Sequence, residues 1–411
     1  MRDVRMRGFA ERADVEEVER FLERVIRPLP SQAVPLLDCA GRVLADDVVA
    51  DVDVPGFARA AMDGYAVRGE DTFGASAYNL LSLRLIGESM PGQPFSGLLQ
   101  AGQAVRIMTG APLPEGADAV LMAESCAERD AQVEISDAVS PRKNVGAVGE
   151  DIRRGERVLR AGRRLRPQDA GVLASIGRGS VPCVRRPHVQ LVVTGDELLP
   201  AGSKPEGVRI VDANSVILRA LVARDGGEFM PFEILPDRPE MIRDAFQNQP
   251  ADVVLVSGGS SVGKEDHAPR LLAELGSLDF HGISMRPSSP AGCGRIGERL
   301  VFLLPGNPVS CMCAYEFFAG PSIRVLGGRP RAWPHRRRVV PLSRKLVSAV
   351  GRTDYVRVAI VSGAAVPIAT SGASILSSTV RADGAVIIPR ELEGMPEGTE
   401  VEVLLYDEDI P

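Results

Sequence analysis

Short apolar runs alternate with helical patterns between Pro187 and Phe318, and this alternation constrains the fold more than any other feature of the chain. It predicts strands at 189–193, 229–235, 253–256, 278–284 and 300–304, and helices at 215–224, 239–247, 267–275 and 309–318. Because the strands are apolar almost throughout, we expect a parallel α/β sheet with helices on both faces. Such sheets bind ligands at the carboxyl ends of their strands.

The segments on either side of this region are richer in turns and short β-like runs. A helix is predicted to begin at Asp14, which with Glu17 fits a capping pair. The other predicted elements are β-like runs between 33 and 135, a helix at 167–175, and strands between 355 and 405 that follow a basic linker at 329–338. The last group predicts a small β-barrel or sandwich.

Composition and charge exclude several classes of protein. The chain has 48 basic and 54 acidic residues, a net charge of −6, whereas a nucleic-acid binder carries a basic surplus. No apolar run approaches the roughly 20 residues that a membrane-spanning helix needs, and the N-terminus is charged where a signal peptide would be apolar. The six cysteines are too scattered for a disulfide framework or a zinc site. We therefore expect a cytoplasmic protein of about two to four domains that binds neither nucleic acid nor membrane.

A glycine-rich loop, S-G-G-S-S-V-G at 257–263, follows the strand predicted at 253–256. Small residues let backbone N–H groups approach an anion such as a phosphate. The loop matches neither the Walker motif nor the dinucleotide-binding motif. A tight turn that requires positive φ explains the glycines equally well, so both interpretations stay open. The loop Pro305-Gly306-Asn307-Pro308 has the same ambiguity.

Carboxylates occupy corresponding places around the predicted strands. Asp196 and Glu197 follow the first strand, Asp237 follows the second, Asp252 opens the third, and Asp266 comes after the glycine-rich loop. Each of them could simply cap a helix. Their convergence on one edge of the sheet, beside a loop that can hold an anion, is what a Mg²⁺-bridged phosphate site requires.

A series of segments, spread in order over nearly the whole chain, is similar to motifs of one known family. The segments are VPGF…AMDGYAV (54–67), RIMTGAPLPEGADAVLMAE (106–124), VGEDIRRGE (148–156), TGDELLPAG (194–202), DANS (212–215), SGGSSVGKED (257–266), LPGNPVS (304–310), GRTDYVR (351–357) and SGASILSS (371–378). Together they resemble the MoeA family of molybdopterin molybdenumtransferases, which includes the E domain of gephyrin.

The resemblance implies a multidomain fold of α/β and β-rich parts. The implied domains are an elongated, discontinuous N-terminal domain (10–50 and 145–180), a β-rich inserted domain (51–144), a molybdopterin-binding parallel α/β domain (181–330) and a C-terminal β-barrel (331–411). The implied reaction inserts molybdate into adenylylated molybdopterin and releases AMP, with Mg²⁺ or another divalent metal. The resemblance also implies a homodimer, with the molybdopterin adenylyltransferase and recipient molybdoenzymes as candidate partners.

The same resemblance assigns roles to individual residues. Asp63, Asp151, Glu197, Asp237 and Asp266 match the family's catalytic acids, and Glu197, Asp237 and Asp266 would hold the metal. The positions that match substrate-binding residues are Thr194, Gly195, Asp196, Ser257, Gly258, Gly259, Ser260, Ser261, Gly263, Arg286, Ser289, Pro305, Gly306, Asn307, Arg352, Arg357 and Ser374. Arginines among them can hold oxyanions with two parallel hydrogen bonds.

Two segments depart from the family pattern. Residues 57–60 read F-A-R-A where the family reads F-D-N-S, and residues 286–290 read R-P-S-S-P where it reads K-P-G-K-P. Arg286 keeps a cation, whereas Ser289 loses one. The retained acids favour an active molybdenum-inserting enzyme. The alternative is a paralogue that binds, carries or senses molybdopterin without inserting metal, and a gephyrin-like scaffold has the least support.

Overall fold

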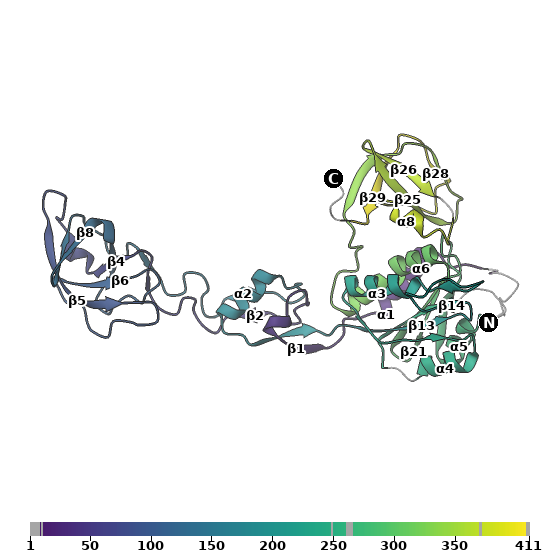
Figure 1. Cartoon of the computed structure of the whole chain (residues 1–411), viewed down its shortest axis with the longest axis horizontal. Coiled ribbons are helices and arrows are strands. Elements are labelled where there is room, and N and C mark those ends of the chain that lie inside the picture. Colours follow the sequence, from purple (N-terminus) through teal and green to yellow (C-terminus); the bar gives the residue numbers. More distant parts are fainter. Residues whose placement is uncertain (1–8, 10, 248–249, 260–265, 370–371, 408–411) are drawn as a thin grey trace. The chain divides into compact units, whose positions relative to one another are not determined.

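The computed structural model describes residue 9 and residues 11–247, 250–259, 266–369 and 372–407. The chain divides into two compact units, one of residues 33–182 and one that combines residues 1–32 with 183–411 (Figure 1). None of the helices described is long and apolar enough to cross a membrane. The cysteines form no disulfide in the described structure.

The unit of residues 33–182 is built mainly from short strands, as the sequence predicts. Its main sheet has the order β7-β4-β6-β5-β9-β8. Buried side chains alternate along the strands, so that Tyr65 and Val67 of β4 contribute to one apolar cluster and Ala66 to another. The elements are β1 (Ser31–Pro35), β2 (Val48–Val49), β3 (Arg59–Ala60), β4 (Gly64–Val67), β5 (Leu81–Ser89), β6 (Gln103–Ile107), β7 (Ala119–Met122), β8 (Cys126–Arg129), β9 (Gln132–Ile135), β10 (Val145–Gly146), β11 (Arg157–Leu159), α2 (Pro167–Ser175) and β12 (Ser180–Val184), with short 3-10 turns η1 (Leu36–Asp38), η2 (Gly69–Thr72) and η3 (Ala123–Ser125).

The second unit contains the predicted α/β sheet, in the order β16-β13-β18-β22-β21-β19 with β17 also pairing β13. Its elements are α1 (Val15–Val25), β13 (His188–Thr194), β14 (Leu198–Leu199), β15 (Ile210–Val211), α3 (Asn214–Asp225), β16 (Glu228–Phe229), β17 (Ile234–Leu235), α4 (Pro239–Gln247), β18 (Val253–Ser257), α5 (Ala268–Leu275), β19 (Ser277–His281), β21 (Gly292–Ile296), β22 (Arg299–Leu304), α6 (Pro308–Ala314), the π-helical turn η4 (Tyr315–Ala319) and α7 (Gly320–Leu326).

The sheet is parallel from β16 to β22, but its other edge is antiparallel, which the alternation did not predict. A two-residue turn containing Gly297, at φ 59°, joins β21 directly to β22. So short a connection can only join antiparallel strands. The strand predicted at 229–235 is also interrupted and forms β16 and β17.

Helices cover both faces of this sheet, with α3 and α6 on one face and α4 and α5 on the other (Figure 1). Successive residues of β18 alternate between two cores, since Val253 and Leu255 pack toward α3 while Val254 and Val256 pack toward α4 and α5. This explains why the strands are apolar almost throughout. The predicted capping role of Asp14 is wrong: its side chain caps no N–H of α1 and instead pairs with Arg390.

The C-terminal part forms a mixed sheet in the order β20-β25-β27-β29-β23, with β26 pairing β25. Its elements are β20 (Met285–Arg286), β23 (Arg337–Pro341), β24 (Leu346–Val347), β25 (Thr353–Val361), β26 (Ala364–Ala369), α8 (Ser377–Val380), β27 (Gly384–Ile388), β28 (Gly394–Met395) and β29 (Glu400–Leu405). Strand β20 comes from the 181–330 segment, so the two parts share a sheet. Closure of this sheet into a barrel stays a prediction.

Candidate functional site

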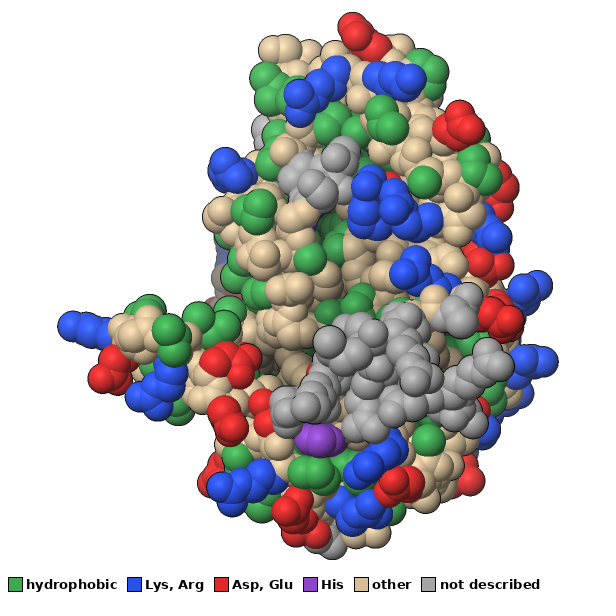
Figure 2. Space-filling view, turned by 90° about the vertical axis from the view of Figure 1, so that its right-hand side faces the viewer, with side chains coloured by type: hydrophobic (Ala, Val, Ile, Leu, Met, Phe, Trp, Pro, Cys, Tyr) green, Lys and Arg blue, Asp and Glu red, His purple; other side chains and the backbone are tan. Residues whose placement is uncertain are grey.

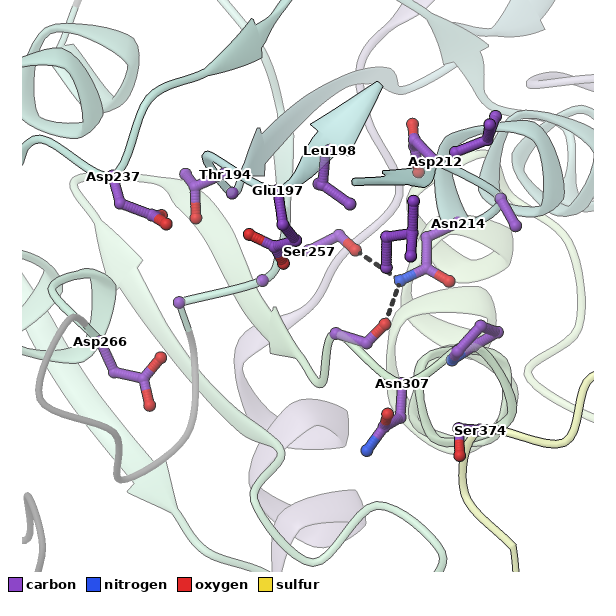
Figure 3. Close-up of a pocket in the computed structure, with 18 residues that line it drawn as sticks. Thr194, Glu197, Leu198, Asp212, Asn214, Asp237, Ser257, Asp266, Asn307 and Ser374 are labelled. Carbon is purple, nitrogen blue, oxygen red and sulfur yellow. Dashed lines mark hydrogen bonds between the residues drawn. The ribbon is translucent and has the colours of Figure 1, made fainter. Parts of the chain in front are cut away.

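A pocket of about 540 Å³ lies at the carboxyl ends of β13, β17, β18 and β22. Each of these strands ends in a loop that the sequence analysis singled out, because parallel strands bring their carboxyl ends to one edge. The predicted residues that line the pocket are Thr194, Gly195, Glu197, Asp237, Ser257, Gly258, Gly259, Asp266, Gly306, Asn307 and Ser374 (Figure 3).

Carboxylates approach this pocket from three loops, those that carry Glu197, Asp237 and Asp266 (Figure 3). Neither Glu197 nor Asp237 has a cationic partner among the residues described. Asp196 does not line the pocket. Its carboxylate accepts a hydrogen bond from the N–H of Asp237 at 3.4 Å, and its own N–H donates to the Asp237 carboxylate at 3.4 Å, which ties the two loops together.

Backbone geometry explains the first two glycines of the glycine-rich loop. Gly258 and Gly259 have φ of 93° and 56°, a region that favours glycine. A Cβ on Gly258 would lie 2.4 Å from the carbonyl oxygen of Thr194. The tight-turn interpretation is therefore confirmed at Gly258 and Gly259, and anion binding stays a prediction. Ser260, Ser261 and Gly263 lie outside the described residues.

Two residues without a predicted role, Asp212 and Asn214, also line the pocket. The Asn214 amide donates hydrogen bonds to Ser257 Oγ at 2.9 Å and to the Gly306 carbonyl oxygen at 2.8 Å, so it joins the loops that follow β18 and β22 (Figure 3). Asp212 accepts a hydrogen bond from the N–H of Ser215 at the start of α3. The segment D-A-N-S at 212–215 could have indicated both residues from the sequence. At a strand–helix boundary, however, the same segment also fits simple helix capping.

Two of the predicted oxyanion-binding arginines, Arg286 and Arg352, meet at a buried carboxylate that the sequence analysis missed. Asp354 is 1% exposed and pairs with Arg286 at 2.5 Å and with Arg352 at 2.7 Å. Ser348 Oγ also donates a hydrogen bond to it. The parallel pairing of β20 with β25 places Arg286 opposite Asp354 in register, a contact between distant segments.

Three further residues predicted to bind substrate, Arg357, Ser289 and Pro305, are buried or half-buried. Arg357 is buried, and burial lowers its pKa. Its guanidinium donates to the Gly372 carbonyl oxygen at 3.5 Å, near the pocket residue Ser374. The hydroxyl of Ser289 is buried with no hydrogen-bond partner among the described residues. Pro305 is buried and does not line the pocket.

The other two predicted acids, Asp63 and Asp151, belong to the unit of residues 33–182 and are exposed. Asp63 accepts hydrogen bonds from the backbone N–H and the hydroxyl of Thr109, each at 2.7 Å, and these bonds lower its pKa. In the departure at 57–60, Arg59 pairs with Glu150, next to Asp151, at 2.7 Å.

Charged side chains of both signs are spread over the face shown in Figure 2, with a group of Lys and Arg near its middle. Within the described ranges, no three His, Cys, Asp or Glu side chains are grouped closely enough to hold a metal ion by themselves. The donors around the pocket are nevertheless carboxylate oxygens, the type that Mg²⁺ prefers when substrate phosphates complete its coordination. The residues present therefore fit a cation shared with a phosphorylated ligand.

Comparison with known proteins covers almost the whole chain. Residues 13–177 match the MoeA N-terminal region (domains I and II), residues 190–325 match a probable molybdopterin binding domain, and residues 339–406 match the MoeA C-terminal region (domain IV).

Individual relatives agree with this. Molybdopterin molybdenumtransferase of Haemophilus influenzae is 35% identical over 82% of this chain and 83% of its own length. Molybdopterin molybdenumtransferase 2 of Mycobacterium tuberculosis is 32% identical over 95% of this chain and 98% of its own. Two crystal structures of the molybdopterin biosynthesis MoeA protein from Pyrococcus horikoshii superpose with TM-scores of 0.83 and 0.76 at 32% identity. They cover 97% and 96% of this chain and 100% of each of those chains.

Proposed function

Because the chain belongs to the MoeA family of molybdopterin molybdenumtransferases, we propose that it inserts molybdate into adenylylated molybdopterin with release of AMP. The chain is an enzyme of molybdenum cofactor biosynthesis, and the names of its relatives do not favour the non-inserting paralogue. The observation that carries the proposal is the convergence of Glu197, Asp237 and Asp266 with the Gly258–Gly259 turn on one pocket.

The phosphate groups of the substrate would lie on the Gly258–Gly259 side of this pocket. Glycine leaves the backbone open to an anion there. The Thr194 hydroxyl is buried, lines the same pocket and has no partner among the described residues, so it can donate a hydrogen bond to a phosphate oxygen. A bound pyrophosphate would be oriented by backbone and hydroxyl groups.

Glu197, Asp237 and Asp266 would hold the divalent metal, with Mg²⁺ as the proposed ion. When bound, it would supply positive charge between the carboxylates and the anionic substrates. Without such a cation the three carboxylates repel a phosphate, so their position around the pocket is itself an argument for a cationic ligand.

Molybdate would bind on the side of the C-terminal sheet, where the resemblance places Arg286, Ser289, Arg352, Arg357 and Ser374. Arg286 and Arg352 share the carboxylate of Asp354, which holds two guanidinium groups side by side. Their remaining N–H groups can donate to an oxyanion. The missing lysine at Ser289 would then reduce the charge of the site without removing it.

We further propose the homodimer and the domain bounds that the resemblance implies, namely 10–50 with 145–180, 51–144, 181–330 and 331–411. In such a dimer Asp63 and Asp151 of one copy would complete the pocket of the other. The molybdopterin adenylyltransferase and recipient molybdoenzymes would be partners in the cytoplasm, and Asp196 and Pro305 would support the loops rather than contact substrate.

The decisive experiment is AMP release by the purified chain from adenylylated molybdopterin with molybdate and Mg²⁺. We expect release that requires both additions and falls at least about 100-fold in Glu197→Gln. Glu206→Gln is the matched control, because Glu206 is exposed, lies nearby in sequence and pairs only with Arg209 among the described residues. AMP release that does not require molybdate, or that is unchanged in Glu197→Gln, would contradict the proposal.

Mixing inactive variants tests the shared site. Asp63→Asn and Glu197→Gln carry their changes in different units, so a heterodimer would keep one intact pocket. Random exchange of subunits should restore roughly a quarter of the wild-type activity. No recovery, in a mixture that light scattering shows to be dimeric, would contradict the shared site and leave the reaction itself supported.

A further inference from the structure

The carbonyl oxygen of the Asn214 side chain is a hydrogen-bond acceptor without a partner, on a residue that lines the pocket. Asn214 is 7% exposed, and its Oδ1 is buried with no partner among the residues described. A buried amide oxygen without a hydrogen bond destabilises the fold. Because Asn214 also lines the pocket, a ligand is the natural source of the missing donor.

The orientation of this amide is fixed by its surroundings. Nδ2 has two hydrogens, and both are used, one on Ser257 Oγ at 2.9 Å and one on the Gly306 carbonyl oxygen at 2.8 Å. Rotating the amide by half a turn would bring Oδ1 against the Gly306 carbonyl, which cannot donate. Oδ1 is therefore held as an acceptor only, and a ligand must present a donor to it.

The neighbouring pocket wall suits a ring and not a phosphate. Leu198, Ile210 and Val211 provide apolar contacts, and the buried carboxylate of Asp212 lines the same cavity (Figure 3). A phosphate offers oxygen acceptors and negative charge, which Asp212 and the Asn214 oxygen both disfavour. An aromatic heterocycle with an amino group offers N–H donors on an apolar plane.

We propose that Asn214 Oδ1 accepts a hydrogen bond from the exocyclic amino group of a heterocycle of the substrate. The proposal rests on the function proposed above and adds a direction, with the amino-bearing ring at Asn214 and the phosphates toward Gly258 and Gly259. Adenylylated molybdopterin carries two rings with this chemistry, the pterin and the adenine. Asn214 is thus a specificity-determining residue for one of them.

Amine-deletion probes test the proposal without turnover. Pterin is compared with 4-oxopteridine, and AMP with purine ribonucleoside monophosphate, each partner lacking only the exocyclic amine. We expect the amino member of one pair to bind wild type roughly 10- to 100-fold more tightly, measured by ring fluorescence or calorimetry. The pair that shows the preference identifies the ring at Asn214.

Variants separate recognition from structural support. Asn214→Leu and Asn214→Ala should abolish the preference. Ser257→Ala removes one partner of Nδ2 but leaves Oδ1, so it should retain the preference. Circular dichroism verifies folding, and the wild-type comparison stands even if a variant does not fold.

The inference is overturned if wild type prefers neither amine, if no probe binds at millimolar concentration, or if both apolar variants keep the preference. Failure of the proposed function would show differently, as absence of molybdate-dependent AMP release by wild type. A ring preference at Asn214 does not depend on that release, so the two results are distinguishable.

Discussion

Two charged regions of the same unit contrast in how their charges are matched. The first region joins α3, η4 and α7. There Arg224 pairs with Glu316 at 2.6 Å and with Asp225 at 2.9 Å, and Arg324 also pairs with Asp225 at 2.8 Å. These carboxylates are nearly inaccessible, and Tyr315 donates a further hydrogen bond to Asp225. In this ion network every carboxylate is matched within the fold.

Two carboxylates of the pocket, by contrast, have no cationic partner in the part of the chain that the structure describes. Glu197 and Asp237 face the cavity without a cation among the described residues. Unpaired carboxylates do not destabilise the fold here because the cavity admits solvent, whereas a buried unpaired charge costs several kcal/mol. The contrast indicates that the ion network stabilises the fold, while the pocket carboxylates are available to a ligand.

Removing one charge from the ion network should have the largest effect on stability. Glu316→Gln keeps the size of the side chain but puts a neutral amide at a buried position beside the half-buried Arg224. We expect a loss of about 3–5 kcal/mol in the free energy of unfolding, measured by urea denaturation. Glu197→Gln is the control and should change it by less than about 0.5 kcal/mol. Equal effects of the two substitutions would remove the contrast.

The same network predicts acid sensitivity. Burial by itself would raise the pKa of Glu316, but the close contact with His335 and the hydrogen bonds from Arg224 outweigh it and lower the pKa from 4.5 to about 2. A lowered pKa stabilises the fold above the unfolded value, and that stabilisation disappears as the pH falls from 4.5 toward about 2. Over this window wild type should lose about 3 kcal/mol more than Glu316→Gln in urea titrations. Parallel pH profiles would contradict this.

At the pocket, neutralising a carboxylate should cost activity and not stability. Asp237→Asn is expected to lower the rate of AMP release by about 100-fold, with a change in the free energy of unfolding below about 0.5 kcal/mol. Because its backbone N–H still donates to Asp196, the loop geometry is preserved. If Asp237→Asn lowered the free energy of unfolding by several kcal/mol, Asp237 would stabilise the fold, as the carboxylates of the ion network do.

Local patterns were enough to predict much of this arrangement. Helix α2 begins at Pro167, which suits the first helical position, and its predicted bounds are confirmed. Strand ends put Glu197 and Asp237 at one edge because parallel strands share their direction. Each of these inferences depends on residues that are close together in the sequence.

Features that depend on distant contacts could not be predicted in this way. The pairing of Arg286 with Asp354 joins residues 68 apart along the chain, and it arises only when β20 adds to the C-terminal sheet. Asn214 is distinguished by an acceptor that its neighbours leave unsatisfied, and sequence periodicity contains no such information. For Gly258, the sequence predicted the conformation but not the close approach of Thr194.

A substitution at Gly258 should have an intermediate effect on stability, and it tests the uncharged backbone turn that lines the pocket. Gly258→Ala would place Cβ 2.4 Å from the Thr194 carbonyl oxygen at a positive φ, so we expect a loss of about 2 kcal/mol and weaker pterin binding. Gly306→Ala is the matched control, since its nearest neighbour would be 3.8 Å away. Urea denaturation and pterin fluorescence measure both effects, and equal tolerance of the two substitutions would contradict the role of Gly258.

The smallest effect is expected at an ion pair that is close in distance but exposed to solvent. Arg59 and Glu150 approach to 2.7 Å, almost as closely as Arg224 and Glu316 at 2.6 Å, yet their side chains are 44% and 37% exposed. Water and salt screen such a pair. The coupling energy between the two side chains, measured by a double-mutant cycle of Arg59→Ala and Glu150→Ala, should therefore be less than about 0.5 kcal/mol. Because the two distances are nearly equal, the difference from Glu316→Gln isolates the effect of burial. A coupling of several kcal/mol at Arg59 would mean that proximity, and not burial, makes the ion network strong.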